Sequence, residues 1–183
     1  TVAVTLSGPT HEVTFRAVDA DGDPTSAPVL SLYGDAPRSD QQLWLSQGQE
    51  RTVEVEEGTY LLHGLLRDYN PQFEQATLVT DPQLAVTGDM EVVLDAGKAK
   101  PVRIETPKPS EPTSILSYYV HREMANGRTI SHGVMHFSTV QQVNVTPTEP
   151  VARGSYEFSS RWQLVAPMVE AHVPGIDGDP NLH

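Results

Sequence analysis

The sequence predicts an all-β protein that consists of two β-sandwich-like units, and three observations predict this class. Apolar and polar side chains alternate over short runs, turn-forming residues separate the runs, and no stretch keeps a helical apolar period over three turns. The 183 residues include 15 prolines and 13 glycines, enough to end each strand after a few residues.

Period-two alternation predicts the strands of the first unit, residues 1–106. The Val13–Ala17 run is typical, because its apolar side chains alternate with threonine and arginine. The other runs in this unit are Val2–Leu6, Leu30–Leu32, Leu43–Leu45, Val53–Val55, Met90–Leu94 and Val102–Ile104. Turn signals lie between them at Ser7–Pro9, Asp21–Pro24, Gly34–Pro37 and Glu57–Gly58. A unit of this length fits a sandwich of roughly seven strands.

A proline-rich segment, 107–113, separates the two predicted units. It holds three prolines and no large apolar residue, which is typical of an extended linker. The second unit, 114–183, has strand-like runs at Ile115–His121, Thr129–Ser138, Gln141–Val145, Ser155–Val165 and Met168–Val173. It is small for a sandwich without disulfides. We therefore expect it to be completed by strands of the first unit, by a partner chain, or by sequence beyond His183.

The charge and composition exclude several classes of function. The formal net charge is −12, from 24 acidic and 12 basic side chains, and such a surface repels nucleic acids and anionic membranes. The chain has no cysteine, which excludes disulfides, cysteine nucleophiles and thiolate metal sites. No apolar run reaches the roughly 18 residues of a membrane helix. These features are typical of a secreted protein.

The first unit carries motifs of a known sandwich type. A strand leads into the turn Asp21–Pro24, and later an acidic residue, Gly58, Thr59 and Tyr60 lead into a hydrophobic strand. This pair of motifs resembles the transthyretin-like or carboxypeptidase-regulatory-like sandwich. The resemblance implies an immunoglobulin-like arrangement in which Gly58 opens the turn and Tyr60 starts a core strand.

A longer set of segments resembles the region downstream of the catalytic domain in secreted subtilisin-like serine proteases of actinobacteria. That region often carries an L-D-A-R-x-A-K-P-V segment, and here Gly97 stands where the arginine is usual. The matching segments are Pro82–Thr87, Val92–Ala96, Lys98–Val102, Tyr156–Phe158 and Arg161–Pro167.

That resemblance implies a non-catalytic accessory region, because the catalytic motifs of the protease family are absent from this sequence. The implied partner is a serine-protease catalytic domain, in the same precursor or as a separate chain. The region would stabilise the enzyme or position its substrate. No Gly-x-Ser-x-Gly elbow and no glycine-rich phosphate loop occurs either, so we expect no enzymatic activity from this chain alone.

One acidic motif has the residue types of a calcium site. Asp19, Asp21 and Asp23 alternate around Gly22, and carboxylates in a curled loop can converge on calcium. The other interpretation is a turn in which aspartate side chains accept hydrogen bonds from nearby backbone amides. A second Asp-Gly-Asp-Pro at Asp177–Pro180 favours the turn. Calcium is the one cofactor that the sequence leaves open.

The histidines suggest a metal-dependent hydrolase only weakly. His132 and His136 are four residues apart, but their neighbours alternate as in a strand. On a strand these side chains lie about 13 Å apart, too far for one ion. A zinc hydrolase that uses His121, His132 or His136 is therefore the least favoured hypothesis.

The aromatic residues support an alternative function, carbohydrate binding by an extracellular β-sandwich. The candidate ligand or interface aromatics are Trp44, Tyr118 and Trp162. Tyr118 and Tyr119 are adjacent, so a strand directs them to opposite faces and at most one lies in the core. The simpler interpretation is that both tryptophans are core or interface anchors.

Overall fold

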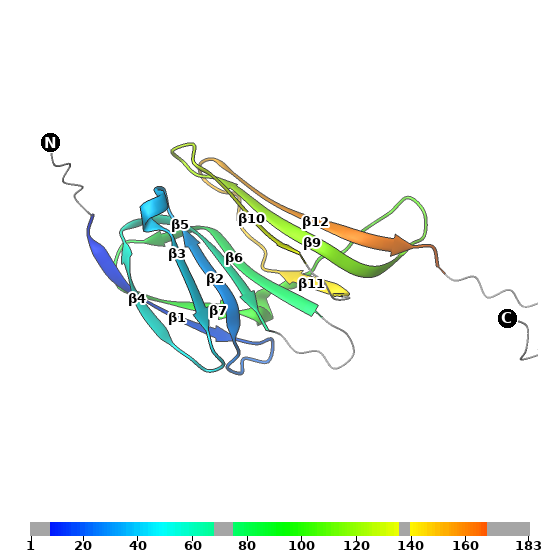
Figure 1. Ribbon diagram of the computed structural model, residues 1–183, viewed down its shortest axis with the longest axis horizontal. Coiled ribbons are helices and arrows are strands. Elements are labelled where there is room, and N and C mark those ends of the chain that lie inside the picture. Colours follow the sequence, from blue (N-terminus) through cyan, green and yellow to red (C-terminus); the bar gives the residue numbers. More distant parts are fainter. Residues whose placement is uncertain (1–7, 68–74, 136–139, 168–183) are drawn as a thin grey trace, which may run out of the picture.

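The computed structural model describes residues 8–67, 75–135 and 140–167, and it confirms the all-β prediction. Within these residues there is no α-helix, and only two short 3₁₀ turns, η1 (Pro37–Ser39) and η2 (Ala96–Lys98), interrupt the strands. No helix in this part of the chain is long and apolar enough to cross a membrane. The strands form three sheets that lie in layers (Figure 1).

The lower sheet in Figure 1 has the strand order β4-β1-β7. Its strands are β1 (Thr10–Val18), β4 (Arg51–Glu56) and β7 (Met90–Asp95). Strand β1 pairs antiparallel with β4 and parallel with β7. Alternation along β1 buries Val13, Phe15 and Ala17 and leaves the residues between them more exposed, as the sequence pattern predicts.

The central sheet has the order β3-β2-β5-β6-β11-β8. Its strands are β2 (Ala27–Tyr33), β3 (Gln41–Leu45), β5 (Gly58–Leu66), β6 (Gln75–Val86), β8 (Lys100–Pro101) and β11 (Gln142–Val145). The upper sheet has the order β10-β9-β12, with β9 (Glu111–Glu123), β10 (Thr129–Met135) and β12 (Ser155–Val165).

The lower and central sheets enclose the first core cluster. Phe15 and Leu94 of the lower sheet meet Leu32 and Leu62 of the central sheet, and all four side chains are buried. Gly64 permits the close approach of the layers, because a side chain there would overlap the Leu94 side chain. The two sheets thus form a β-sandwich around this cluster.

The central and upper sheets enclose a second core cluster. Leu61 and Leu78 of the central sheet pack with Tyr118, Val120 and Met124, which follow one another along β9 and its turn. The central strands β5 and β6 are therefore buried on both faces, and their burial patterns are nearly continuous rather than alternating.

The two halves of the chain share the central sheet. Strand β11 comes from the second half and pairs parallel with β6 of the first half. It also pairs with β8, a strand of two residues. The strand predicted at Val102–Ile104 is wrong, because strand β8 ends at Pro101 and these residues have no regular structure. Strand β9 begins at Glu111, within the segment predicted as a linker.

Two predicted strands, Val2–Leu6 and Met168–Val173, lie outside the described residues, as do the last residues of the run predicted at Thr129–Ser138.

Candidate functional site

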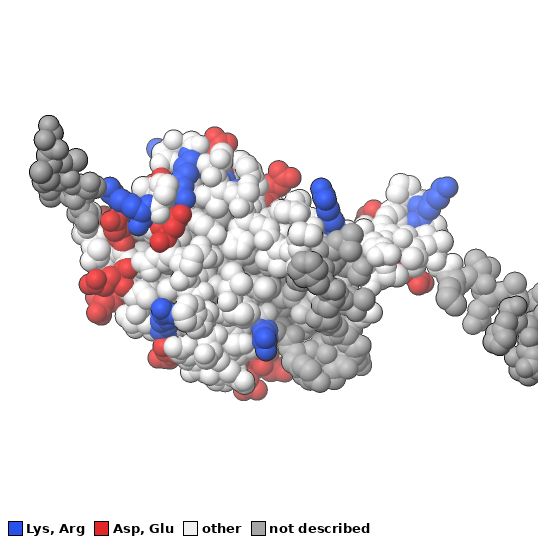
Figure 2. All heavy atoms as spheres, in the orientation of Figure 1, with Lys and Arg blue, Asp and Glu red and all other residues white. Residues whose placement is uncertain are grey.

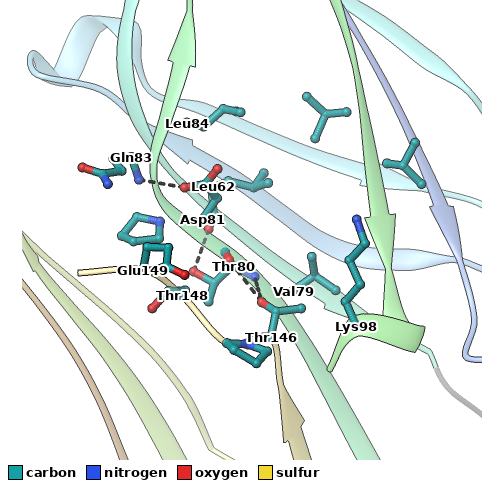
Figure 3. A pocket seen from close by; sticks show the side chains of 14 residues that line it. Leu62, Val79, Thr80, Asp81, Gln83, Leu84, Lys98, Thr146, Thr148 and Glu149 are labelled. Atoms are coloured by element: carbon teal, nitrogen blue, oxygen red, sulfur yellow. Dashed lines mark hydrogen bonds between the residues drawn. The ribbon is translucent and has the colours of Figure 1, made fainter. Parts of the chain in front are cut away.

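The main candidate site is a groove of about 490 Å³ beside strand β7, where the lower sheet ends and the central sheet continues (Figure 3). We call it the β7 groove. Strand β7 contributes Val92 and Val93. The remaining lining residues are Leu62, Val79, Thr80, Asp81, Pro82, Gln83, Leu84, Lys98, Thr146, Pro147, Thr148 and Glu149.

A β-bulge in β6 shapes one wall of the β7 groove. Tyr60 of β5 pairs with Leu84, and Leu62 pairs with Asp81, so β6 has one residue more than β5 in this interval. Pro82 is tolerated there because a bulged residue does not take part in the regular ladder. The Asp81 carboxylate accepts a 2.9 Å hydrogen bond from the Gln83 backbone N–H and holds the bulge in shape.

Below the bulge, Thr146 closes the edge of β6. Its backbone N–H donates to the Leu78 carbonyl, and its hydroxyl accepts a 2.9 Å hydrogen bond from the Thr80 N–H. The same hydroxyl donates to the Thr80 carbonyl at 3.1 Å. These bonds satisfy the backbone next to the groove and fix the segment that carries Thr148 and Glu149 against the central sheet.

The charges in the β7 groove are separated. Figure 3 shows Asp81, Gln83 and Glu149 gathered on one side and Lys98 on the other. The floor between them includes buried apolar side chains such as Val79 and Leu84. This combination suits a ligand with apolar groups in its middle and a positive charge near the two carboxylates.

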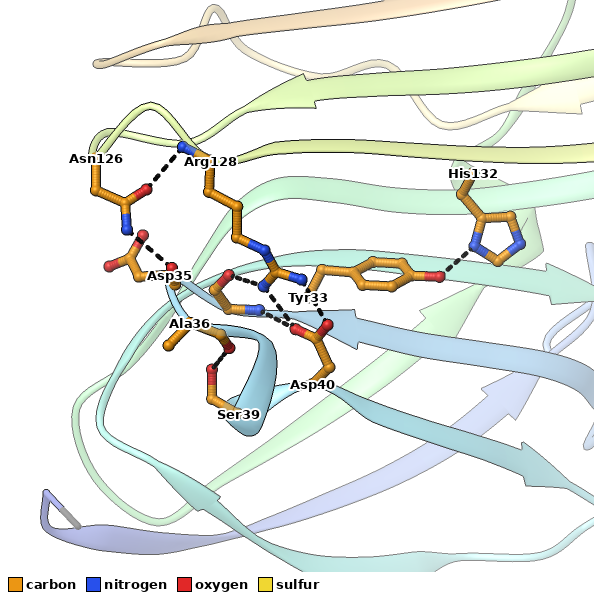
Figure 4. Close-up of polar contacts among 9 residues, drawn as sticks. Tyr33, Asp35, Ala36, Ser39, Asp40, Asn126, Arg128 and His132 are labelled. Atoms are coloured by element: carbon orange, nitrogen blue, oxygen red, sulfur yellow. Dashed lines mark hydrogen bonds and ion pairs between the residues drawn. The ribbon is translucent and has the colours of Figure 1, made fainter. Parts of the chain in front are cut away.

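The chain is acidic in total, but its charges are not spread evenly over the surface. In the view of Figure 2, acidic side chains lie mainly around the rim of the first sandwich, and the middle of the visible face carries few charges. Some of these charges form ion pairs, of which the Arg128–Asp40 pair is the best aligned (Figure 4).

A second polar cluster lies inside the second core. His63 of β5 and His132 of β10 stack across the space between the central and upper sheets. The Tyr33 hydroxyl and the His132 Nδ1 atom share a 2.7 Å hydrogen bond, which Figure 4 also shows. Burial and the neighbouring His132 lower the pKa of His63 to about 3. Burial also lowers the pKa of His132. Both rings are therefore neutral at pH 7, which suits a structural role in the core.

Arg122 is a buried cation that is held by the backbone. Its side chain donates to the carbonyl oxygens of Pro82, Glu123, Arg153 and Ser155. Desolvation lowers the pKa of its guanidinium, while the charges of nearby acidic groups partly oppose the change. Through these bonds Arg122 ties the upper sheet to the β6 bulge. It also lines a smaller cavity of about 170 Å³.

The three aspartates of the predicted calcium site form a turn. Asp19 Oδ1 accepts hydrogen bonds from the backbone N–H groups of Asp21 and Asp23, at 3.0 and 2.9 Å. This is the bonding of the turn interpretation. Among the described residues, no group of three or more histidine, aspartate or glutamate side chains could hold a metal ion. Calcium binding stays a prediction, and Asp177–Pro180 lies outside the described residues.

The three aromatics singled out in the sequence lie in different environments. Trp44 is 59% exposed on β3, and the Arg51 guanidinium lies 4.9 Å from its ring centroid. Tyr118 is fully buried in the second core cluster, and burial raises the pKa of its hydroxyl. Trp162 is partly buried against the same cluster. The structure therefore does not bring these three rings together on one surface.

The histidines of the zinc hypothesis point in different directions. His121 lies on the outer face of the upper sheet, where its Nδ1 atom and the Ser131 hydroxyl are 2.8 Å apart. His132 points into the second core. His136 lies outside the described residues.

Sequence reasoning did not identify a binding site at the β7 groove or at His63, although several groove residues belong to the protease-like segments. Asp81 and Gln83 flank a proline within an otherwise strand-like segment, which is a signal for a bulge or an edge. Lys98 and Glu149 had no such signal, because only the packing of the sheets brings them to the same groove.

No protein-family model and no curated protein matches the chain. One similar solved structure is a DUF3823 family protein from Parabacteroides merdae, which is 14% identical. The alignment covers 75% of this chain and 79% of that chain, with a TM-score of 0.32. At this level the similarity carries no conclusion about fold or function.

Proposed function

We propose that this chain is a non-catalytic accessory region of a secreted subtilisin-like serine protease, in the same precursor as the catalytic domain or associated with it as a separate chain. Its role would be to stabilise the enzyme or to position its substrate. The observation that carries the proposal is the structural role of two protease-like regions: Val92–Val102 connects the two cores, and side chains of β12 pack against the second core cluster.

The Val92–Val102 segment makes that connection. Leu94 is buried in the first core, and the Asp95 carboxylate accepts a 2.9 Å hydrogen bond from the Gly97 N–H as the chain turns through η2. Val102 then packs against the second core cluster, and its N–H donates to the Val143 carbonyl. Because this segment has a structural role, its resemblance to the protease region supports a similar structural framework in the two proteins.

The second protease-like region has the same kind of role. Tyr156, Phe158 and Trp162 of β12 all pack against the second core cluster. The Tyr156 hydroxyl donates to the Thr80 hydroxyl at 3.3 Å, which links β12 to the central sheet. The protease-like motifs therefore lie at positions that hold the sheets together. A module that stabilises an enzyme or positions its substrate needs such a framework to present its surface to the partner.

Native mass spectrometry of the chain purified from its producing cells tests the proposal. We expect a species heavier than the 20.0 kDa chain that contains a serine hydrolase, detected by labelling with a fluorophosphonate probe. A covalent fusion and a non-covalent complex are separated by denaturing the sample. A lone 20.0 kDa species with no labelled partner would overturn the proposal.

A second candidate function, carbohydrate binding, is favoured by one feature of the upper sheet. On its outer face the Tyr119 ring covers Gly133 of the neighbouring strand, where any side chain would overlap the ring. Tyr119 is 37% exposed and Met135 nearby on β10 is 65% exposed. An exposed aromatic ring that lies over a sheet is a suitable surface for stacking a sugar.

Retention on insoluble polysaccharides tests this second candidate. We expect the purified chain to bind cellulose, chitin or xylan, and we expect Tyr119→Ala and Trp44→Ala to weaken retention. Tyr156→Phe is the matched control, because that side chain packs in the interior. A chain that is not retained on any of the three polymers would exclude the candidate.

A further inference from the structure

We propose that the β7 groove binds an extended polypeptide segment with a basic side chain, and that this segment adds a fourth strand to the lower sheet along the edge of β7. The inference goes beyond the accessory role, because it requires no protease and assigns a surface and a partner chemistry to the chain itself.

The first support is the free edge of β7. This strand pairs with β1 on one side, and in the described part of the chain no strand pairs with its other side. Its six residues, Met90–Asp95, include no proline or glycine. A regular edge of this length presents unpaired backbone N–H and C=O groups, which are the groups that an added strand needs.

The second support is the layer beneath that edge. The lower sheet has three strands and the central sheet has six, so the central sheet extends beyond β7. Strand β7 lies over β5, as the close approach of Leu94 to Gly64 shows. An added strand beside β7 would therefore lie over the neighbouring strand β6. Val79 and Leu84 of β6 line the groove there and would receive alternate apolar side chains of the segment.

The third support is the charge in the groove. Asp81 and Glu149 lie on the same side of the groove, away from Lys98 (Figure 3). A lysine or arginine of the bound segment would be attracted to these two carboxylates, and the net charge of −12 favours the approach of a basic partner.

A second copy of this chain does not fit as the occupant. Pairing of two β7 edges would bring together two grooves that carry the same carboxylates, in molecules that each have a formal charge of −12. Like charges at such close range disfavour the contact. A different polypeptide with the opposite charge avoids this repulsion.

The test uses the whole 183-residue chain and a defined probe, the peptide acetyl-Lys-Val-Thr-Val-Thr-Val-amide. Binding is followed by NMR chemical shifts and by amide hydrogen exchange. We expect saturable shifts centred on Met90–Asp95 and on the lining of the groove, together with slower exchange of alternate β7 amides. The same peptide with glutamate in place of lysine should bind about tenfold more weakly.

Two comparisons make the test specific. The double variant Asp81→Asn with Glu149→Gln should weaken binding of the lysine peptide about fivefold. The control is Asp21→Asn with Glu157→Gln, which removes the same amount of charge at exposed positions away from the groove and should leave binding unchanged. Peptides methylated on alternate backbone nitrogens, in both registers, test the pairing itself, and at least one register should lose binding.

Three results would overturn the inference. The first is an absence of saturable shifts at β7 with the lysine peptide. The second is binding that survives methylation in both registers, since strand addition depends on the peptide N–H groups. The third is equal weakening by the two double variants, which would indicate general charge attraction. None of these results bears on a protease partner, so the two proposals can fail independently.

Discussion

The imidazole ring of His63 stacks on that of His132, with the ring centroids 3.9 Å apart and the planes inclined by 16°. The Tyr118 ring also stacks on His63, with the ring centroids 6.2 Å apart and the planes inclined by 26°. Neither ring nitrogen of His63 has a hydrogen-bond partner among the described residues, and the side chain is fully buried. Two strands from opposite halves of the chain thus meet through a pair of neutral imidazoles that cannot both take up a proton without cost.

This pair predicts a loss of stability in acid. The pKa of His63 is about 3 in the folded chain and has an ordinary value of 6.5, so between these values the unfolded chain binds more protons. The contribution to stability is complete above pH 6.5 and is lost as the pH falls toward 3. From pH 7 to pH 5, His63 should lower the free energy of unfolding by about 2 kcal/mol.

Urea unfolding at the two pH values measures this effect. His63→Phe keeps an aromatic ring against His132 but does not titrate, so its stability should change less between pH 7 and pH 5. Tyr60→Phe is the control, because it keeps a buried aromatic ring in the first core and leaves both histidines in place, so it should retain the full pH dependence. If the stability of His63→Phe fell between pH 7 and pH 5 as much as that of the unsubstituted chain, the assignment of this pH dependence to His63 would be wrong.

The ion pair between Arg128 and Asp40 should stabilise the fold more than a surface pair does. It is bidentate, with N–O distances of 2.8 and 2.6 Å, and both side chains are about four-fifths buried. It fastens the β9–β10 turn to the loop before β3 (Figure 4). A double-mutant cycle with Arg128→Gln and Asp40→Asn should give a coupling of about 1–3 kcal/mol.

The Arg16–Glu91 pair is a matched comparison for that cycle. It has a single contact of 2.5 Å between more exposed side chains. Its coupling should be below about 1 kcal/mol and should fall further in 1 M salt. Equal coupling energies for the two pairs would show that burial and bidentate geometry have no effect here.

Arg122→Met should be strongly destabilising. The substitution removes the donor of a buried hydrogen bond to the Pro82 carbonyl and of partly buried hydrogen bonds to the carbonyls of Arg153 and Ser155. We expect a loss of about 3 kcal/mol or more in the free energy of unfolding. Arg161→Met, at an exposed position in the same sheet, should change it by less than about 0.5 kcal/mol. Chemical denaturation of the two variants measures the difference.

Two glycines, Gly133 in β10 and Gly154 just before β12, should respond differently to substitution by alanine. Gly154 has a φ of +74°, and a side chain there would overlap the Glu123 carbonyl oxygen, which is backbone and cannot move freely. Gly133 would meet only the Tyr119 ring, which can rotate away. Gly154→Ala should therefore cost well over 1 kcal/mol and Gly133→Ala less than that. Similar unfolding midpoints for the two variants would contradict this explanation.

Much of the first sandwich could be predicted because its outer strands are buried on one face. The alternation of apolar and polar residues in Val13–Ala17 and Met90–Leu94 follows from burial on one face, and both segments are strands of the lower sheet. The apolar run Tyr60–Leu66 carried a different signal, burial on both faces. It indicates a central strand, but it does not say which segment covers the second face.

The sequence therefore specifies an all-β chain, the positions of most strands and turns, and an acidic surface, since these depend on short-range patterns and composition. The packing of the three sheets determines which distant residues meet. The pairing of β11 with β6, the stack of His63 on His132 and the approach of Glu149 to Asp81 join positions nearly 70 residues apart. Such contacts depend on strand order and register, and they cannot be predicted from the local alternation of apolar and polar residues.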